Sequence, residues 1–177
     1  GWRLDFSIAR DLVSHLLPVG LVRAFAASEM ILYDAWKQRI VRPGLPKKRV
    51  FEAGGSQRLA VYEPEWEQVE DRLKQFGDGD FAILENNRGD YVQCAGSSNR
   101  LTVEYRLWKE DGFHHWVAGN QLEDAEQSQI DGPDGPMLVR AYEVLTVADA
   151  VKLFKAFHDK SQRSDRYRWR DISSAFR

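Results

Sequence analysis

The sequence contains very little cysteine: Cys94 is the only one among its 177 residues. A single thiol cannot form a disulfide within the chain, which excludes the disulfide-rich class of small secreted domains. We therefore predict a protein of the reducing cytoplasm, with a periplasmic protein without disulfides as the alternative. Cys94 stands between Gln93 and Ala95 in an apolar stretch, and this setting predicts a buried thiol rather than a reactive one.

A large net charge and long apolar runs are missing as well. The formal net charge of -2 at pH 7 excludes a polybasic chain, so nucleic-acid binding would need a local basic patch. The fairly apolar stretch Leu12–Leu32 is interrupted by Pro18, Gly20, Arg23 and Glu29. A transmembrane helix needs about 20 mainly apolar residues, so we predict no membrane span.

Short catalytic and metal-binding motifs are also lacking, including a nucleophile elbow and a phosphate-binding loop. The stretches Gly77–Asp80 and Asp131–Gly135 carry oxygen ligands without the spacing of a calcium loop, and we interpret both as turns. His114 and His115 would point to opposite faces of a strand, so they cannot bind one metal together. We expect neither a metal nor a cofactor.

What the sequence does contain is a series of four short apolar runs separated by turn residues. The runs are Phe81–Leu84, Tyr91–Ala95, Leu101–Trp108 and Phe113–Ala118. Asn or Gly in each gap accepts the positive φ angles of hairpin turns. The aromatic and β-branched residues of the runs are typical of strands. The pattern predicts an antiparallel meander.

A helix is predicted on each side of this meander. The first spans Glu63–Phe76, with Pro64 in its first turn, Gly77 at its C′ position and one apolar stripe made by Trp66, Val69, Leu73 and Phe76. The second starts with a capping-box-like pair, Thr146 and Asp149, and runs to about His158. Its inward residues are Ala150, Val151, Phe154 and Phe157.

The remaining segments complete an α+β chain. Residues 1–41 are predicted as an N-terminal helical arm, 42–49 as a linker rich in proline and basic residues, and 50–177 as the main domain. We expect short strands at Val50–Glu52 and Arg58–Tyr62, a loop over Asn120–Pro136, and strands at Met137–Val144 and Arg166–Ile172. The predicted fold is an antiparallel β-meander sheet packed by helices.

Residues 81–172 resemble a group of small bacterial proteins. The resemblance rests on Phe81–Glu85, Tyr91–Gln93, Leu101–Arg106, His114–Trp116, the helix at Leu145–Phe157 and Trp169–Ile172. This pattern is similar to immunity proteins of polymorphic-toxin and contact-dependent inhibition systems. The resemblance implies a sheet with helices at its side and a non-enzymatic protein that neutralises a cognate toxin by direct contact.

Candidate contact residues follow from the chemistry of tight interfaces, in which aromatic and charged side chains dominate. On the meander we select Glu104, Trp108, Asp111, His114 and Trp116 as partner-binding residues. The acidic segment 63–71 could face a basic partner, because complementary fields speed association. A solvated helix face is the alternative for that segment.

Two other functions stay open. A small enzyme could use His114 or His115 with Glu104 as a general base on the sheet face. A single-strand nucleic-acid binder could use the Arg-rich tail, in which Arg168 and Arg170 alternate with aromatic residues. The other interpretation of that tail is a strand whose aromatic side chains lie in the core.

Overall fold

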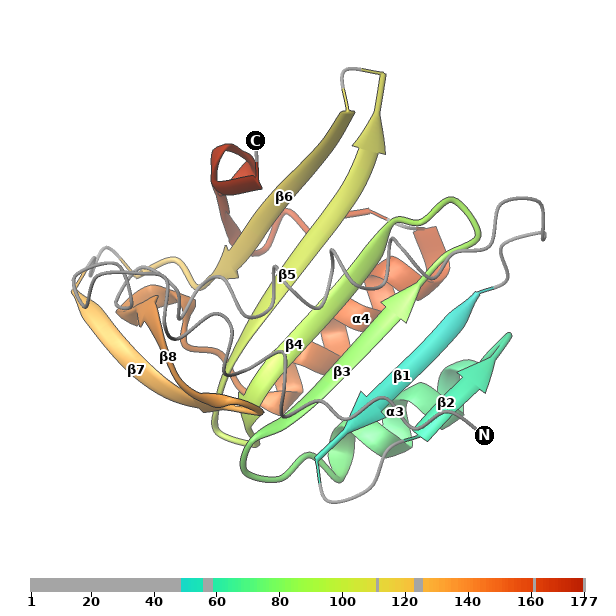
Figure 1. Ribbon diagram of the computed structural model, residues 1–177, viewed down its shortest axis with the longest axis horizontal. Helices are drawn as coiled ribbons and strands as arrows, with labels where there is room; N and C mark the ends of the chain where they lie inside the picture. Colours follow the sequence, from blue (N-terminus) through green and yellow to red (C-terminus); the bar gives the residue numbers. More distant parts are fainter. Residues whose placement is uncertain (1–48, 56–58, 111, 123–125, 161, 177) are drawn as a thin grey trace, which may run out of the picture. The chain divides into compact units, whose positions relative to one another are not determined.

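The computed structural model describes residues 49–55, 59–110, 112–122, 126–160 and 162–176 (Figure 1). The chain divides into two units, Gly1–Ile40 and Val41–Arg177, and every described residue belongs to the second. The predicted helical arm and the predicted linker, apart from Arg49, lie outside the described residues, and both stay predictions.

A seven-stranded antiparallel sheet forms the centre of this unit (Figure 1). Its spatial order is β2-β1-β3-β4-β5-β6-β9. The strands are β1 (Val50–Gly54), β2 (Leu59–Tyr62), β3 (Asp80–Glu85), β4 (Tyr91–Ser97), β5 (Arg100–Lys109), β6 (Gly112–Gly119) and β9 (Arg168–Asp171). Strands β3 to β6 pair successively and antiparallel, so the predicted meander is confirmed.

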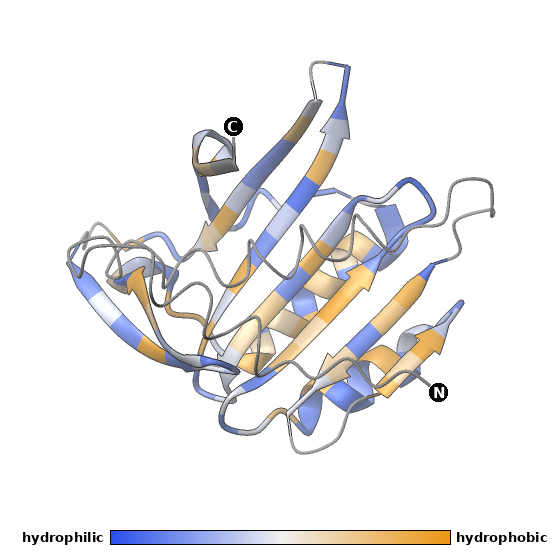
Figure 2. Cartoon of the chain, viewed as in Figure 1, coloured by the Kyte–Doolittle hydropathy of each residue, from blue (hydrophilic) through white to orange (hydrophobic). Residues whose placement is uncertain are grey.

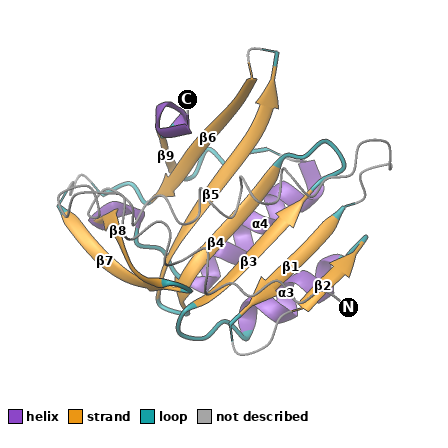
Figure 3. Cartoon of the chain, in the orientation of Figure 1, coloured by secondary structure: helices purple, strands orange, loops and turns teal. Residues whose placement is uncertain are grey.

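Two helices, α3 (Trp66–Lys74) and α4 (Val147–Lys160), lie on one face of the sheet (Figures 1 and 3). The apolar side chains of alternate strand positions pack with those of the helices in one core. Figure 2 shows hydrophobic residues on β1, β3 and α4. This core includes Phe51, Leu73, Leu84, Val103, Tyr105, Leu153, Phe154 and Phe157, each 0–2% exposed. The α+β class is confirmed. We call the opposite side of the sheet the second face.

Helix α3 is shorter than predicted at both ends. The backbone N–H of Glu63 donates to the carbonyl of Arg49, which extends the β1–β2 pairing, and Glu63 has a φ of 50°. The helix therefore begins at Trp66 after the N-cap Glu65, and Pro64 precedes it. It ends before the C-cap Gln75, so the assignments of Pro64 to the first turn and of Gly77 to C′ were wrong.

Helix α4 begins as predicted. The N–H of Thr146 donates to Oδ2 of Asp149 at 3.1 Å, and the N–H of Asp149 donates to Oγ1 of Thr146 at 3.4 Å. These two bonds satisfy amide groups that have no partner within the helix. The helix continues two residues beyond the expected end, to Lys160.

The largest correction concerns the segment after the meander. A two-stranded sheet is formed by β7 (Gln127–Gly132) and β8 (Gly135–Arg140), where we predicted a loop up to Pro136. Residues Ala141–Glu143, expected to continue the strand, form a short 3-10 helix, η2. Strand β7 is polar, and Ile130 is its main buried side chain. Because it lacks an apolar pattern, it can be recognised as a strand only from its pairing with β8. No helix among the described residues is long and apolar enough to cross a membrane.

Candidate functional site

The predicted contact residues lie on both faces of the sheet. Tyr105 belongs to the core on the helix side, so Glu104 and Trp108, at alternate positions of β5, point to the second face. Strand register pairs Leu107 with His114 and Tyr105 with Trp116, which places these two β6 residues on the helix side. Asp111 lies outside the described residues. The five residues therefore do not form one surface.

Trp108 and Trp116 differ sharply in exposure. Trp108 is 48% exposed, whereas Trp116 is 6% exposed. The indole of Trp116 stacks on His114 at 5.4 Å between ring centroids, and the guanidinium of Arg163 lies 4.0 Å from its centroid. Trp116 and His114 therefore support the body of the protein, and Trp108 is the tryptophan of this pair that a partner can reach.

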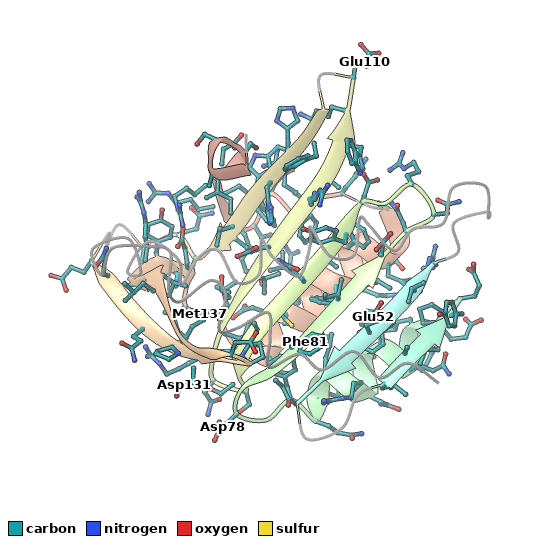
Figure 4. The ribbon with its side chains drawn as sticks, viewed as in Figure 1. Glu52, Asp78, Phe81, Glu110, Asp131 and Met137 are labelled. Carbon is teal, nitrogen blue, oxygen red and sulfur yellow. The ribbon has the colours of Figure 1, made fainter. Side chains whose placement is uncertain are left out.

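Trp108 is carried by a projecting hairpin. Strand β4 pairs with β5 only as far as Arg106, so the β5–β6 hairpin extends past its neighbour (Figure 1). Glu110 lies at the tip of this hairpin (Figure 4). The backbone N–H of Trp108 donates to Oδ1 of Asp90 at 2.7 Å, which ties the hairpin to the β3–β4 turn.

Arg106 supports Trp108 from within the second face. Its guanidinium lies 4.2 Å from the ring centroid of Phe113, 5.3 Å from that of Trp108 and 5.5 Å from that of Tyr91. Such cation–π contacts are stronger when the cation is shielded from water, and Arg106 is 4% exposed. Sequence reasoning missed this residue, although the alternation of β5 places it between Glu104 and Trp108.

The second face also holds a polar cluster made by three neighbouring strands. Oε2 of Glu104 accepts hydrogen bonds from Nε2 of Gln93 on β4 and from Nε2 of His115 on β6, both at 2.9 Å. Gln93 is 2% and His115 1% exposed. Gln93 pairs directly with Glu104 in the register, whereas His115 is its diagonal neighbour. The structure thus brings together Glu104 and one of the two histidines proposed for an enzyme.

The pKa of Glu104 indicates which charge this carboxylate carries in the cluster. Burial acts to raise the pKa of Glu104, but hydrogen bonds from His115 and Gln93 and the positive charges of His115 and Arg170 outweigh it and hold the pKa below its usual range. Glu104 is therefore an anion at neutral pH and cannot serve as a general acid. Its acceptor Oε2 already binds two buried side chains, an arrangement suited to fixing three strands together.

The Arg-rich tail is engaged within the fold. The hydroxyl of Tyr167 donates to Oδ1 of Asp149 at 2.9 Å, and the ring of Trp169 lies 4.9 Å from that of Tyr105 in the core. Arg170 forms an ion pair with Glu143, whose side chain is fully buried. These contacts agree with the interpretation in which the aromatic residues of this strand lie in the core.

Among the described residues, no group of three or more His, Cys, Asp or Glu side chains could hold a metal ion. The arrangement thus offers a buried polar cluster, which organises the second face, and a projecting hairpin with an exposed indole. In comparisons with known proteins, no family model and no curated protein matches the chain.

Proposed function

We propose that this is a non-enzymatic cytoplasmic protein that neutralises a cognate bacterial toxin by direct contact through the β5–β6 hairpin. The observation that carries the proposal is the exposure of Trp108, 48% of whose surface is open on a hairpin that projects past the sheet (Figure 1). Tryptophan is enriched among the few residues that supply most of the binding energy of interfaces.

The setting of Trp108 favours tight binding. Its ring packs edge-to-face on Phe113 at 5.8 Å, the guanidinium of Arg106 lies 5.3 Å from its centroid, and its backbone is held by Asp90. A side chain that is already ordered loses little conformational entropy when a partner covers it. The hairpin therefore presents a rigid aromatic anchor.

An acidic surface supports a basic partner. Exposed carboxylates cluster on and next to α3, at Glu65, Glu67, Asp71 and Asp78. The exposed Lys74 is paired with Glu70 at 2.8 Å, so it offsets little of this charge. A negative field of this kind speeds association with a positively charged toxin and weakens as salt increases.

In this proposal, the other selected contact residues have roles different from that of Trp108. Glu104 fixes the strands beneath the hairpin, and His114 and Trp116 pack on the helix side of the sheet. The contact assigned to Asp111, which lies outside the described residues, stays a prediction.

The test is binding to the toxin encoded beside the gene, measured by calorimetry with Trp108→Ala and with the control Tyr62→Ala. Tyr62 is 69% exposed on the edge strand β2, so it matches Trp108 in kind and exposure. We expect Trp108→Ala to weaken binding by roughly thirtyfold or more, the size of an interface hot spot, and the control to stay within about twofold. Absence of a complex at any salt concentration, or equal effects of both variants, would contradict the proposal.

A further inference from the structure

A polar pocket of about 460 Å³ lies where the β3–β4 turn meets the C-terminal end of α4. Four separate segments supply its walls: the start of β1, the residue after β2, the turn and the end of the helix. The lining residues are Arg49, Glu63, Asn86, Asn87, Arg88, His158, Asp159 and Lys160. Its volume falls within the range of small-molecule sites.

Positive charge dominates this pocket. Arg49, Arg88 and Lys160 contribute three cations, against the two carboxylates of Glu63 and Asp159. Both carboxylates are already engaged. Oε1 of Glu63 accepts the backbone N–H of Arg49 at 3.1 Å, and Oδ1 of Asp159 lies 3.0 Å from Nζ of a neighbouring lysine, Lys155. Arg88 is itself paired with the carboxylate of Asp90, so the positive charge that the pocket offers to a ligand comes from Arg49 and Lys160.

The side chain of Arg49 faces an imidazole rather than a carboxylate. Its Nη1 lies 3.1 Å from Nε2 of His158. Nδ1 of the same ring lies 3.2 Å from Oδ1 of Asp159. The carbonyl of Pro64, an alternative partner of Nε2, is more distant at 3.4 Å. Among the described residues, no carboxylate lies within ion-pair distance of the side chain of Arg49 or Lys160.

The turn that carries Arg88 is held in place before any ligand arrives. Oδ1 of Asn86 accepts the backbone N–H groups of Arg88 at 2.8 Å and of Asp90 at 3.1 Å. The carboxylate of Asp90 in turn binds Arg88 at 2.8 Å. A preformed wall reduces the entropy lost on binding.

We propose that this pocket binds a phosphate group, either inorganic phosphate or the phosphate of a small phosphorylated molecule. Phosphate offers several acceptor oxygens and up to two negative charges, which suits the guanidinium of Arg49 and the ammonium of Lys160. Asn87 adds a side-chain amide donor to the same wall. Trp108 is not among the residues that line this pocket, and the proposal does not depend on a toxin partner.

The experiment is a chemical-shift titration of the full chain, first with inorganic phosphate and then with glycerol phosphate, at constant ionic strength. We expect saturable shifts at the amides of residues 86–88 and 158–160. Tighter binding of glycerol phosphate would identify a phosphorylated molecule as the ligand, whereas equal or weaker binding would identify inorganic phosphate.

Two variants and one control decide the outcome. Lys160→Gln and Arg49→Met should each weaken phosphate binding about tenfold, because each removes one charge-assisted contact. Lys160 is exposed at the end of the helix, so its variant should fold normally. Lys152→Gln, an exposed lysine of α4 outside the pocket lining, should bind as the unaltered chain does. Shifts that do not saturate, or an affinity unchanged in Lys160→Gln, would overturn the proposal.

Discussion

The carboxylate of Glu104 lies 2.9 Å from Nε2 of His115, diagonally across the β5–β6 pair. The same carboxylate oxygen accepts a hydrogen bond from Gln93, so one partly buried anion joins β4, β5 and β6. Removing its charge tests whether the cluster stabilises the sheet, as its burial and low pKa indicate.

Glu104→Gln should lower the free energy of unfolding at pH 7 by about 2 kcal/mol, because it weakens two buried hydrogen bonds to a charged group. The pKa of Glu104 is lower in the folded state, so its contribution is present above the unfolded value of about 4.3 and lost as the pH falls through the folded pKa. Urea unfolding should therefore show a difference between the two proteins that narrows below about pH 4. A difference that is constant from neutral to acidic pH would contradict this account.

A second pair that can be tested joins the partly exposed Arg170 to the fully buried Glu143. Nη2 of Arg170 lies 2.9 Å from Oε2 of Glu143, which also accepts the backbone N–H of Arg140 at 3.0 Å. Arg170→Met leaves this fully buried carboxylate without its cation, and we expect a loss of about 3–5 kcal/mol in unfolding free energy. The double variant Arg170→Met with Glu143→Leu should be more stable than Arg170→Met alone. Equal stabilities would show that the pair is not coupled.

Alanine substitutions at Gly96 and Gly112 can distinguish the free-energy cost of backbone strain from that of steric overlap. Both have a positive φ, 140° and 118°. A Cβ on Gly96 would lie 2.3 Å from the carbonyl oxygen of Arg100 and 2.6 Å from Cα of Leu101, whereas one on Gly112 meets nothing within 4 Å.

Gly112→Ala should cost about 1–2 kcal/mol for the strained backbone alone. Gly96→Ala should cost at least about 1–3 kcal/mol more, because the backbone of the β4–β5 hairpin must move. Thermal unfolding of the two variants measures the difference. If both variants lost the same unfolding free energy, the close approach of Gly96 to Arg100 and Leu101 would not contribute to the cost of the substitution.

Cys94 should be inert in the folded protein. It is 1% exposed, and burial raises the pKa of its thiol. A chromogenic thiol reagent at pH 8 should leave it unmodified in buffer and modify it fully in concentrated urea. Fast modification in buffer, at a rate similar to that in urea, would show that the sheet opens around this residue.

Local sequence patterns were sufficient for the strands of the meander and for the start of α4. Turn residues such as Gly89, with its φ of 85°, and the capping pair Thr146 and Asp149 act on the backbone next to them, so their effect can be predicted from neighbouring residues. Strand β7 and the start of α3 could not be predicted in this way. Strand β7 is mostly polar and has no apolar alternation, and the pairing with the following strand β8 defines it. The start of α3 depends on the hydrogen bond from Glu63 to Arg49, a residue much earlier in the chain.

The same distinction between local pattern and tertiary contact applies to the candidate site. The sequence by itself determined that Glu104 and a neighbouring histidine could meet on the sheet, because strand alternation restricts which side chains share a face. Only the tertiary structure decided that His115 is the partner, that Trp108 rather than Trp116 is exposed, and that Arg49 and Lys160 line one pocket. Pairing order and helix packing set these contacts, and they join segments far apart in the chain that no local pattern connects.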